Sequence, residues 1–83
     1  MLIITAAQCR SARALIEMTQ PALARAAKLG LSTIVDFEKS RRQLPHSTIQ
    51  AIREALERAG VQFIDEDGGG AGVRLRKRQP KKS

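Results

Sequence analysis

The sequence has almost no aromatic residues: it contains no Trp and no Tyr, and its two aromatic side chains are Phe37 and Phe63. Binders of RNA or single-stranded DNA stack bases on aromatic side chains, so this composition argues against that class. Cysteine is equally scarce, because Cys9 has no second cysteine with which to form an internal disulfide. One thiol in a chain without a signal-like segment leads us to expect a reducing, cytoplasmic location.

Long apolar runs and catalytic clusters are also missing. No stretch approaches the roughly 20 apolar residues that cross a bilayer, so we expect no membrane partner. His46 is the only histidine and is remote in sequence from Cys9, and no carboxylate pair or nucleophile–base pair stands out. The glycines at 68–70 lack the Lys-Ser/Thr of a phosphate-binding loop. We therefore expect no enzyme, no metal site and no cofactor.

The positive charge is concentrated at one end of the chain. The net charge is +7, but residues 1–73 carry nine basic and eight acidic side chains, whereas residues 74–83 carry six basic and none acidic. This predicts a domain over residues 1–76 that is close to neutral up to residue 73, a disordered basic tail over 77–83 and a polyanionic partner. A domain of 83 residues is marginal as a monomer, so we expect a dimer.

Apolar spacing and turn residues predict a mainly α fold of four helices, at about 6–17, 20–27, 31–39 and 48–59, followed by a β-hairpin with strands at about 61–64 and 72–76. Residues 1–4 are a further strand candidate. The predicted caps are Thr5 with Gln8, Thr19 or Gln20, Gly30, and Ser47 with Gln50.

The same spacing predicts which helical positions face inward and which face solvent. In the first helix we expect Arg10 and Arg13 to point outward, and in the last helix we expect an exposed Glu54–Arg58 ion pair. The expected inward positions of these two helices are Cys9, Ala12, Leu15, Ile16, Ile49, Ile52, Ala55, Leu56 and Ala59.

The stretch from Gln20 to Lys39 organises the chain. Leu23 and Ala27 are four residues apart, Ile34 and Phe37 are three apart, and Leu29 between the pairs is placed to plug a turn. Two short helices locked in this way are typical of a DNA-binding helix-turn-helix, whose second helix enters the major groove.

These residues, with the frame around them, resemble a known family. Thr19-Gln20, Leu23 to Ala27, Ser32 to Ile34 and Asp36 to Lys39 are similar to the small lambda-repressor/Cro-like (XRE) helix-turn-helix regulators, and the likeness extends over roughly residues 5 to 76. The chain departs from the family at Lys28, where the usual residue is a left-handed Gly.

The resemblance implies site residues for double-stranded DNA. Base edges would be contacted by Leu31, Ser32, Val35 and Asp36. Asp36 has a second reading, as an ion-pair partner of Arg41 or Arg42. Phosphates would be contacted by Gln20, Lys28, Thr33, Lys39, Arg41 and Arg42.

The expected function is therefore a homodimeric transcriptional repressor that occupies a palindromic operator, often its own promoter. Proteins of this pattern also control mobile elements, phage-like switches and toxin–antitoxin operons. The alternative is a protein-interaction module, an anti-activator or antitoxin, because the reading helix has an apolar face at Leu31 and Val35 and lacks the Arg, Gln or Asn of bidentate base contacts.

Overall fold

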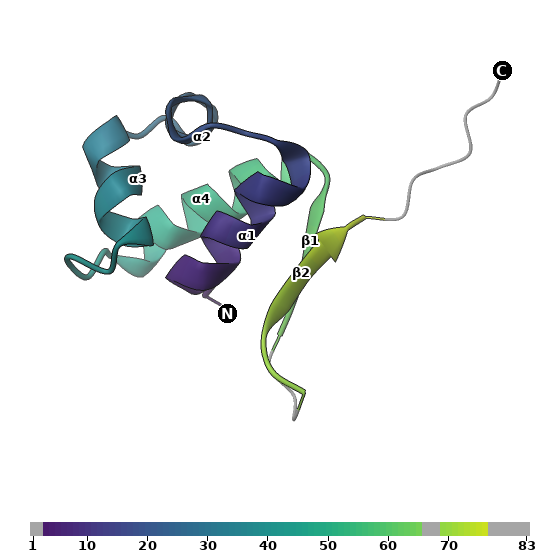
Figure 1. The fold of residues 1–83 in the computed structure, drawn as a ribbon. Helices are drawn as coiled ribbons and strands as arrows, with labels where there is room; N and C mark the ends of the chain where they lie inside the picture. The colour runs from purple at the N-terminus through teal and green to yellow at the C-terminus, as the bar shows by residue number, and fades with distance from the viewer. Residues whose placement is uncertain (1–2, 66–68, 77–83) are drawn as a thin grey trace, which may run out of the picture.

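The computed structural model describes residues 3–65 and 69–76 and contains the four helices and the hairpin that the sequence predicts (Figure 1). The predicted tail at 77–83 lies outside the described residues. In the described part of the chain no helix is both long and apolar enough to cross a membrane. The helices are α1 (Ala6–Ile16), α2 (Gln20–Ala27), α3 (Leu31–Glu38) and α4 (His46–Arg58), and the strands are β1 (Val61–Ile64) and β2 (Gly72–Leu75). Ile3 and Ile4 are not in a strand, so the predicted strand at 1–4 is absent there; Ile4 instead joins the core.

The first two helices begin where the sequence predicts. Thr5 and Gln8 form a complete capping box, in which the Gln8 N–H donates to Thr5 Oγ1 at 3.0 Å and the Thr5 N–H donates to Gln8 Oε1 at 2.9 Å. Thr19 caps α2 through the Ala22 N–H, at 3.1 Å from its Oγ1. Gln20 is therefore the first helical residue and not the N-cap.

The predicted Ser47 cap of α4 is wrong. The N-cap residue is Pro45, whose extended backbone (φ −58°, ψ 149°) precedes the helix. Its carbonyl accepts the first hydrogen bonds, from the N–H groups of Thr48 at 3.0 Å and Ile49 at 3.1 Å. Because the fixed φ of Pro45 already directs the chain into the first turn, α4 starts two residues earlier than predicted and has no side-chain cap.

On α1, Arg13 was predicted to face outward and Leu15 to face inward, and the structure shows the opposite for both. Arg13 lies four residues after Cys9, which is about 40° around a helix, whereas Leu15 lies about 120° away. Cys9 is fully buried, the Arg13 side chain is 20% exposed, and Leu15 is 41% exposed. The predicted outward Arg13 and inward Leu15 are therefore both wrong, because position on the helix outweighs residue type here.

The α2 helix packs against α3 and α4, and α1 packs against α3 and α4. The largest fully buried side chains are Leu23, Ile34, Ile52, Leu56, Val61 and Cys9. On α4 the predicted pair Glu54–Arg58 is wrong: Glu54 accepts from Gln50, and the ion pair of this helix joins Arg53 and Glu57 at 2.9 Å. Ala59 was expected to face inward but is exposed, because it is the C-cap, where the chain leaves the helix.

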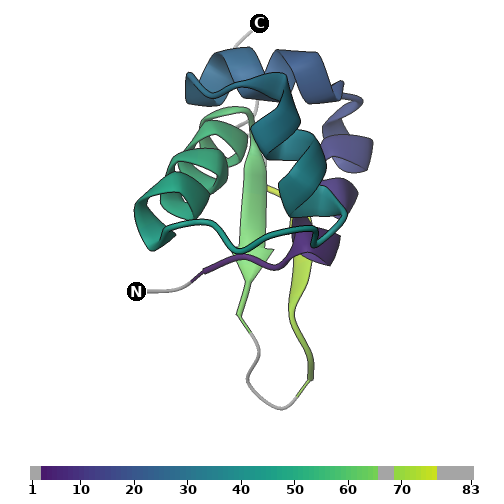
Figure 2. The same cartoon turned by 90° about the vertical axis from the view of Figure 1, so that its left-hand side faces the viewer.

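The hairpin packs on α1 and α4, and α3 lies on the opposite side of the domain (Figures 1 and 2). Its strands are antiparallel, with Val61 opposite Leu75 and Phe63 opposite Val73. The buried Gln8 amide joins α1 to it, since Nε2 donates to the Gly72 carbonyl at 2.9 Å. The hairpin thus completes the core and leaves the outer side of α3 open.

Candidate nucleic-acid interface

A three-residue turn, Lys28 to Gly30, joins α2 to α3. Lys28 adopts a left-handed conformation (φ 61°), and its N–H and that of Leu29 donate to carbonyls in the last turn of α2. A non-Gly residue in this conformation costs on the order of 1 kcal/mol. Leu29 packs against the core, and Gly30 is the N-cap of α3 as predicted. The turn therefore forms with Lys28 in it, and the Lys28 side chain is exposed.

The face of α3 that points away from the core contains three of the predicted base-contacting residues. Leu31 is 45% exposed, Ser32 is exposed and Val35 is half-buried, while Ile34 and Phe37 face the core. We call Leu31, Ser32 and Val35 the exposed face of α3. This face is apolar except for one hydroxyl, and it carries no charge of its own.

Asp36, the fourth predicted base-contacting residue, is engaged by cations. Its carboxylate lies 3.2 Å from Arg42 Nε and 3.9 Å from Arg41 Nη1, and Arg42 Nη2 lies 3.5 Å from Thr33 Oγ1. Of the two readings of Asp36, the structure therefore contains the ion pair. Arg42 thus reaches back along α3 from the loop that follows it, to Asp36 and to Thr33 in the first turn.

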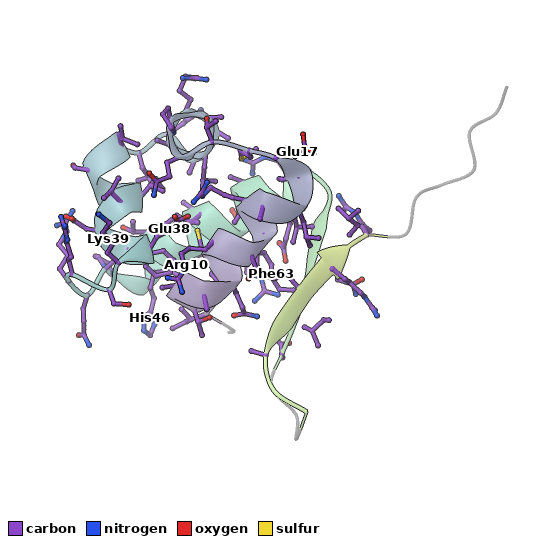
Figure 3. The ribbon with its side chains drawn as sticks, in the orientation of Figure 1. Arg10, Glu17, Glu38, Lys39, His46 and Phe63 are labelled. Atoms are coloured by element: carbon purple, nitrogen blue, oxygen red, sulfur yellow. The ribbon has the colours of Figure 1, made fainter. Side chains whose placement is uncertain are left out.

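Cations thus flank the exposed face of α3 at both ends. Lys28 precedes the helix, and Lys39, Arg41 and Arg42 follow it, all four exposed (Lys39 is labelled in Figure 3). Guanidinium and ammonium groups placed beside a groove-sized helix suit phosphate contacts, and an exposed pair such as Asp36–Arg42 contributes little to stability. Arg42 therefore remains available to a stronger anion.

Gln20 is held differently from the other predicted phosphate residues. Its side-chain amide donates to Glu38 Oε1 at 2.9 Å, beneath the start of α2. Glu38 also accepts from Arg13 Nε at 2.6 Å, Arg13 Nη2 at 2.7 Å and Cys9 Sγ at 3.1 Å. Arg10 donates to the Glu38 carbonyl, and Figure 3 places these two residues side by side between α1 and α3. We call Cys9, Arg13, Gln20 and Glu38 the Glu38 cluster.

The Glu38 cluster fixes two protonation states. Burial alone would raise the pKa of Glu38, but the hydrogen bonds from Arg13, Cys9 and Gln20 outweigh burial and hold this pKa below its ordinary value. Burial, together with the hydrogen bond to the Glu38 carboxylate and its negative charge, raises the pKa of the Cys9 thiol. Glu38 is therefore ionised and Cys9 is a neutral thiol at pH 7.

The sequence contains one signal for this cluster. Arg13 follows Cys9 by four residues and so shares its buried stripe, which requires a buried acid as partner. Glu38 directly follows the buried Phe37 at the end of α3, and its side chain is only 2% exposed. The cluster ties α1, α2 and α3 together through the Glu38 carboxylate.

No protein-family model and no curated protein matches this chain. Within residues 3–65 and 69–76, no three His, Cys, Asp or Glu side chains come together as a metal-ligand set. The arrangement that stands out in the described residues is a short helix with an exposed apolar face and exposed cations before and after it.

Proposed function

We propose that the chain is a sequence-specific, double-stranded-DNA-binding transcriptional regulator of the lambda-repressor/Cro-like helix-turn-helix type, acting as a homodimeric repressor. The observation that carries this proposal is the exposed face of α3, bounded by Lys28 at one end and by Lys39, Arg41 and Arg42 at the other. A helix presented in this way matches the width of the major groove, and the cations reach the phosphates on either side.

In this mechanism α3 lies in the major groove with its exposed face against the bases. Leu31 and Val35 contact thymine methyl groups, and Ser32 exchanges a hydrogen bond with a base edge. Arg41 and Arg42 give up their ion pairs with Asp36 and form ion pairs with backbone phosphates instead. Two copies place their α3 helices in successive major grooves about 34 Å apart, and the bound dimer blocks polymerase.

The phosphate contacts give affinity, whereas the exposed face of α3 gives sequence selectivity. Gln20 adds a contact at the start of α2, where backbone N–H groups also favour a phosphate. In that contact it would exchange its bond to Glu38 for one to the DNA, or hold both with its two amide hydrogens.

One observation favours a second candidate function, a protein-interaction module. Leu31 is among the most exposed large apolar residues of the described chain, and the exposed face of α3 has no Arg, Asn or Gln to form a bidentate base contact. Such a face also suits an apolar pocket on another protein, as in an anti-activator or antitoxin.

A gel-shift assay on the DNA upstream of the chain's own gene separates the two functions. We expect a shifted band that survives nonspecific competitor DNA. Its affinity should fall by about 10³ or more between 50 and 200 mM salt, the dependence of a protein with at least six phosphate contacts. A band that competitor abolishes, or an affinity insensitive to salt, would refute the repressor and favour the interaction module.

A further inference from the structure

A cavity of about 560 Å³ opens between the N-terminal segment, the loop from α3 to α4, and the first turn of α4. Its lining includes three apolar side chains, Ile3, Phe37 and Ile49, which we call its floor. It also includes polar side chains, among them Arg41, Arg42 and His46, which we call its rim. Phe37 and Ile49 are each 8% exposed and belong to the core, whereas Ile3 is 39% exposed. This volume falls within the range of about 300–1,000 Å³ that is typical of small-molecule sites.

The rim favours a singly charged anion. Arg41, Arg42 and Asp36 together carry a net charge of +1, and Asp36 itself does not line the cavity. Asp36 engages Nε of Arg42 and approaches only Nη1 of Arg41, so other N–H donors of the two guanidinium groups remain for a ligand. Two guanidinium groups, 60% and 53% exposed and next to an apolar floor, match a carboxylate attached to an apolar chain.

We propose that this cavity binds a small amphipathic monocarboxylate, with its apolar part on Ile3, Phe37 and Ile49 and its carboxylate on Arg41 and Arg42. Because the same two arginines contact phosphates in the proposed function, an occupied cavity would weaken DNA binding, as an inducer does. This regulatory consequence rests on the proposed function, whereas binding to the cavity does not.

The first test is a titration of the ¹⁵N-labelled chain, without DNA, with octanoate and separately with octanol. The two probes share an apolar chain and differ in charge. We expect saturable shifts of the backbone amides of Ile3, Arg42 and Ile49, with octanol binding at least tenfold more weakly. No saturation by about 10 mM octanoate, shifts scattered over the surface, or equal affinities for the two probes would each overturn the proposal.

Matched variants test the two halves of the cavity. Arg41→Gln combined with Arg42→Gln should weaken octanoate at least tenfold and leave octanol unchanged, whereas Ile3→Asp should weaken both. Lys28→Gln is the control, because it removes an exposed cation that does not line the cavity. Equal loss of octanoate affinity in the control would show general charge attraction and refute the site.

A second arm measures operator DNA binding with each probe present. Octanoate should lower DNA affinity at concentrations that saturate the spectra, and octanol should not at the same concentration. Saturable octanoate binding without any effect on bound DNA would refute the regulatory consequence alone. Failure of the chain to bind DNA would refute the proposed function, and the DNA-free spectra would still decide whether the cavity is a carboxylate site.

Discussion

Replacing Glu38 with Gln should lower the free energy of unfolding at pH 7 by about 3 kcal/mol. The Glu38 side chain is 2% exposed and its carboxylate accepts four hydrogen bonds, two of them from Arg13. Breaking a buried ion pair by neutralising one partner costs about 3–5 kcal/mol, since the other charge loses its compensation. The lower end applies here, because the Arg13 side chain retains 20% exposure to water.

This loss is large for a domain of this size. At roughly 0.05–0.15 kcal/mol per residue, 83 residues give a total stability of about 4–12 kcal/mol. A change of about 3 kcal/mol at the unfolding midpoint corresponds to a decrease in Tm of about 12–24 °C. The Glu38 variant should therefore be close to the limit of folding at physiological temperature.

Urea denaturation followed by circular dichroism measures the change, with Glu54→Gln as the control. Glu54 is an exposed carboxylate with one hydrogen bond, from Gln50, and its replacement should alter stability by less than about 0.5 kcal/mol. Arg13→Gln combined with Glu38→Gln should cost clearly less than the sum of the single variants. A loss under about 1 kcal/mol for Glu38→Gln, or strict additivity with Arg13→Gln, would refute the role assigned to the Glu38 cluster.

Three further predictions concern the same framework. Because the folded pKa of Glu38 lies below its ordinary value, its stabilising contribution is complete above about pH 5 and is lost as the pH falls through the folded pKa. The wild-type chain should thus lose more stability than Glu38→Gln between about pH 5 and pH 2 in urea titrations; equal losses would contradict the pKa assignment. The buried Cys9 thiol should react with a thiol reagent at pH 8 only at the rate of unfolding, so rapid labelling of the native chain would show that the thiol is accessible. Lys28→Gly should raise the free energy of unfolding by about 0.5–1 kcal/mol, because it relieves the left-handed strain, and it should weaken DNA binding. If chemical denaturation instead gives a lower free energy of unfolding for this variant, the Lys28 side chain stabilises the turn.

Local signals in the sequence were sufficient for most of the fold. Thr5 with Gln8, and Thr19, mark helix starts through side-chain hydrogen bonds between residues three apart. Gly30 is the N-cap of α3 without such a bond. Apolar spacing located the buried Leu23, Ile34, Ile52 and Leu56 because each lies on a regular helical stripe. Such features depend only on residues that are close together in the sequence, so they can be read from the sequence directly.

The Glu38 cluster could not be derived in the same way. Arg13 and Glu38 are 25 residues apart and meet only because α1 and α3 pack together. Residue type predicts that both lie in water, and the burial of each is favourable only in the presence of the other. The likeness to a regulator family suggested that Gln20 contacts a phosphate, but it did not indicate that the same amide is already bonded to Glu38.

The cavity beside Arg41 and Arg42 was not foreseen for a related reason. Its floor combines residues from the N-terminal segment, α3 and α4, which are far apart in the sequence. For Asp36 the sequence allowed two roles, a base contact and an ion pair. The fold selects the ion pair, because the loop after α3 brings Arg42 Nε to 3.2 Å from the Asp36 carboxylate.

The most direct test of the central claim is selection of preferred DNA sequences from a random pool by the wild-type chain and by Ser32→Asn. Ser32 is exposed on α3, so we expect its replacement to leave the fold intact. We predict a palindromic preference for the wild-type chain, and a change confined to one position of each half-site for the variant, because Asn forms a bidentate contact with adenine. The same preference for both proteins, or no preference for either, would contradict base recognition by α3.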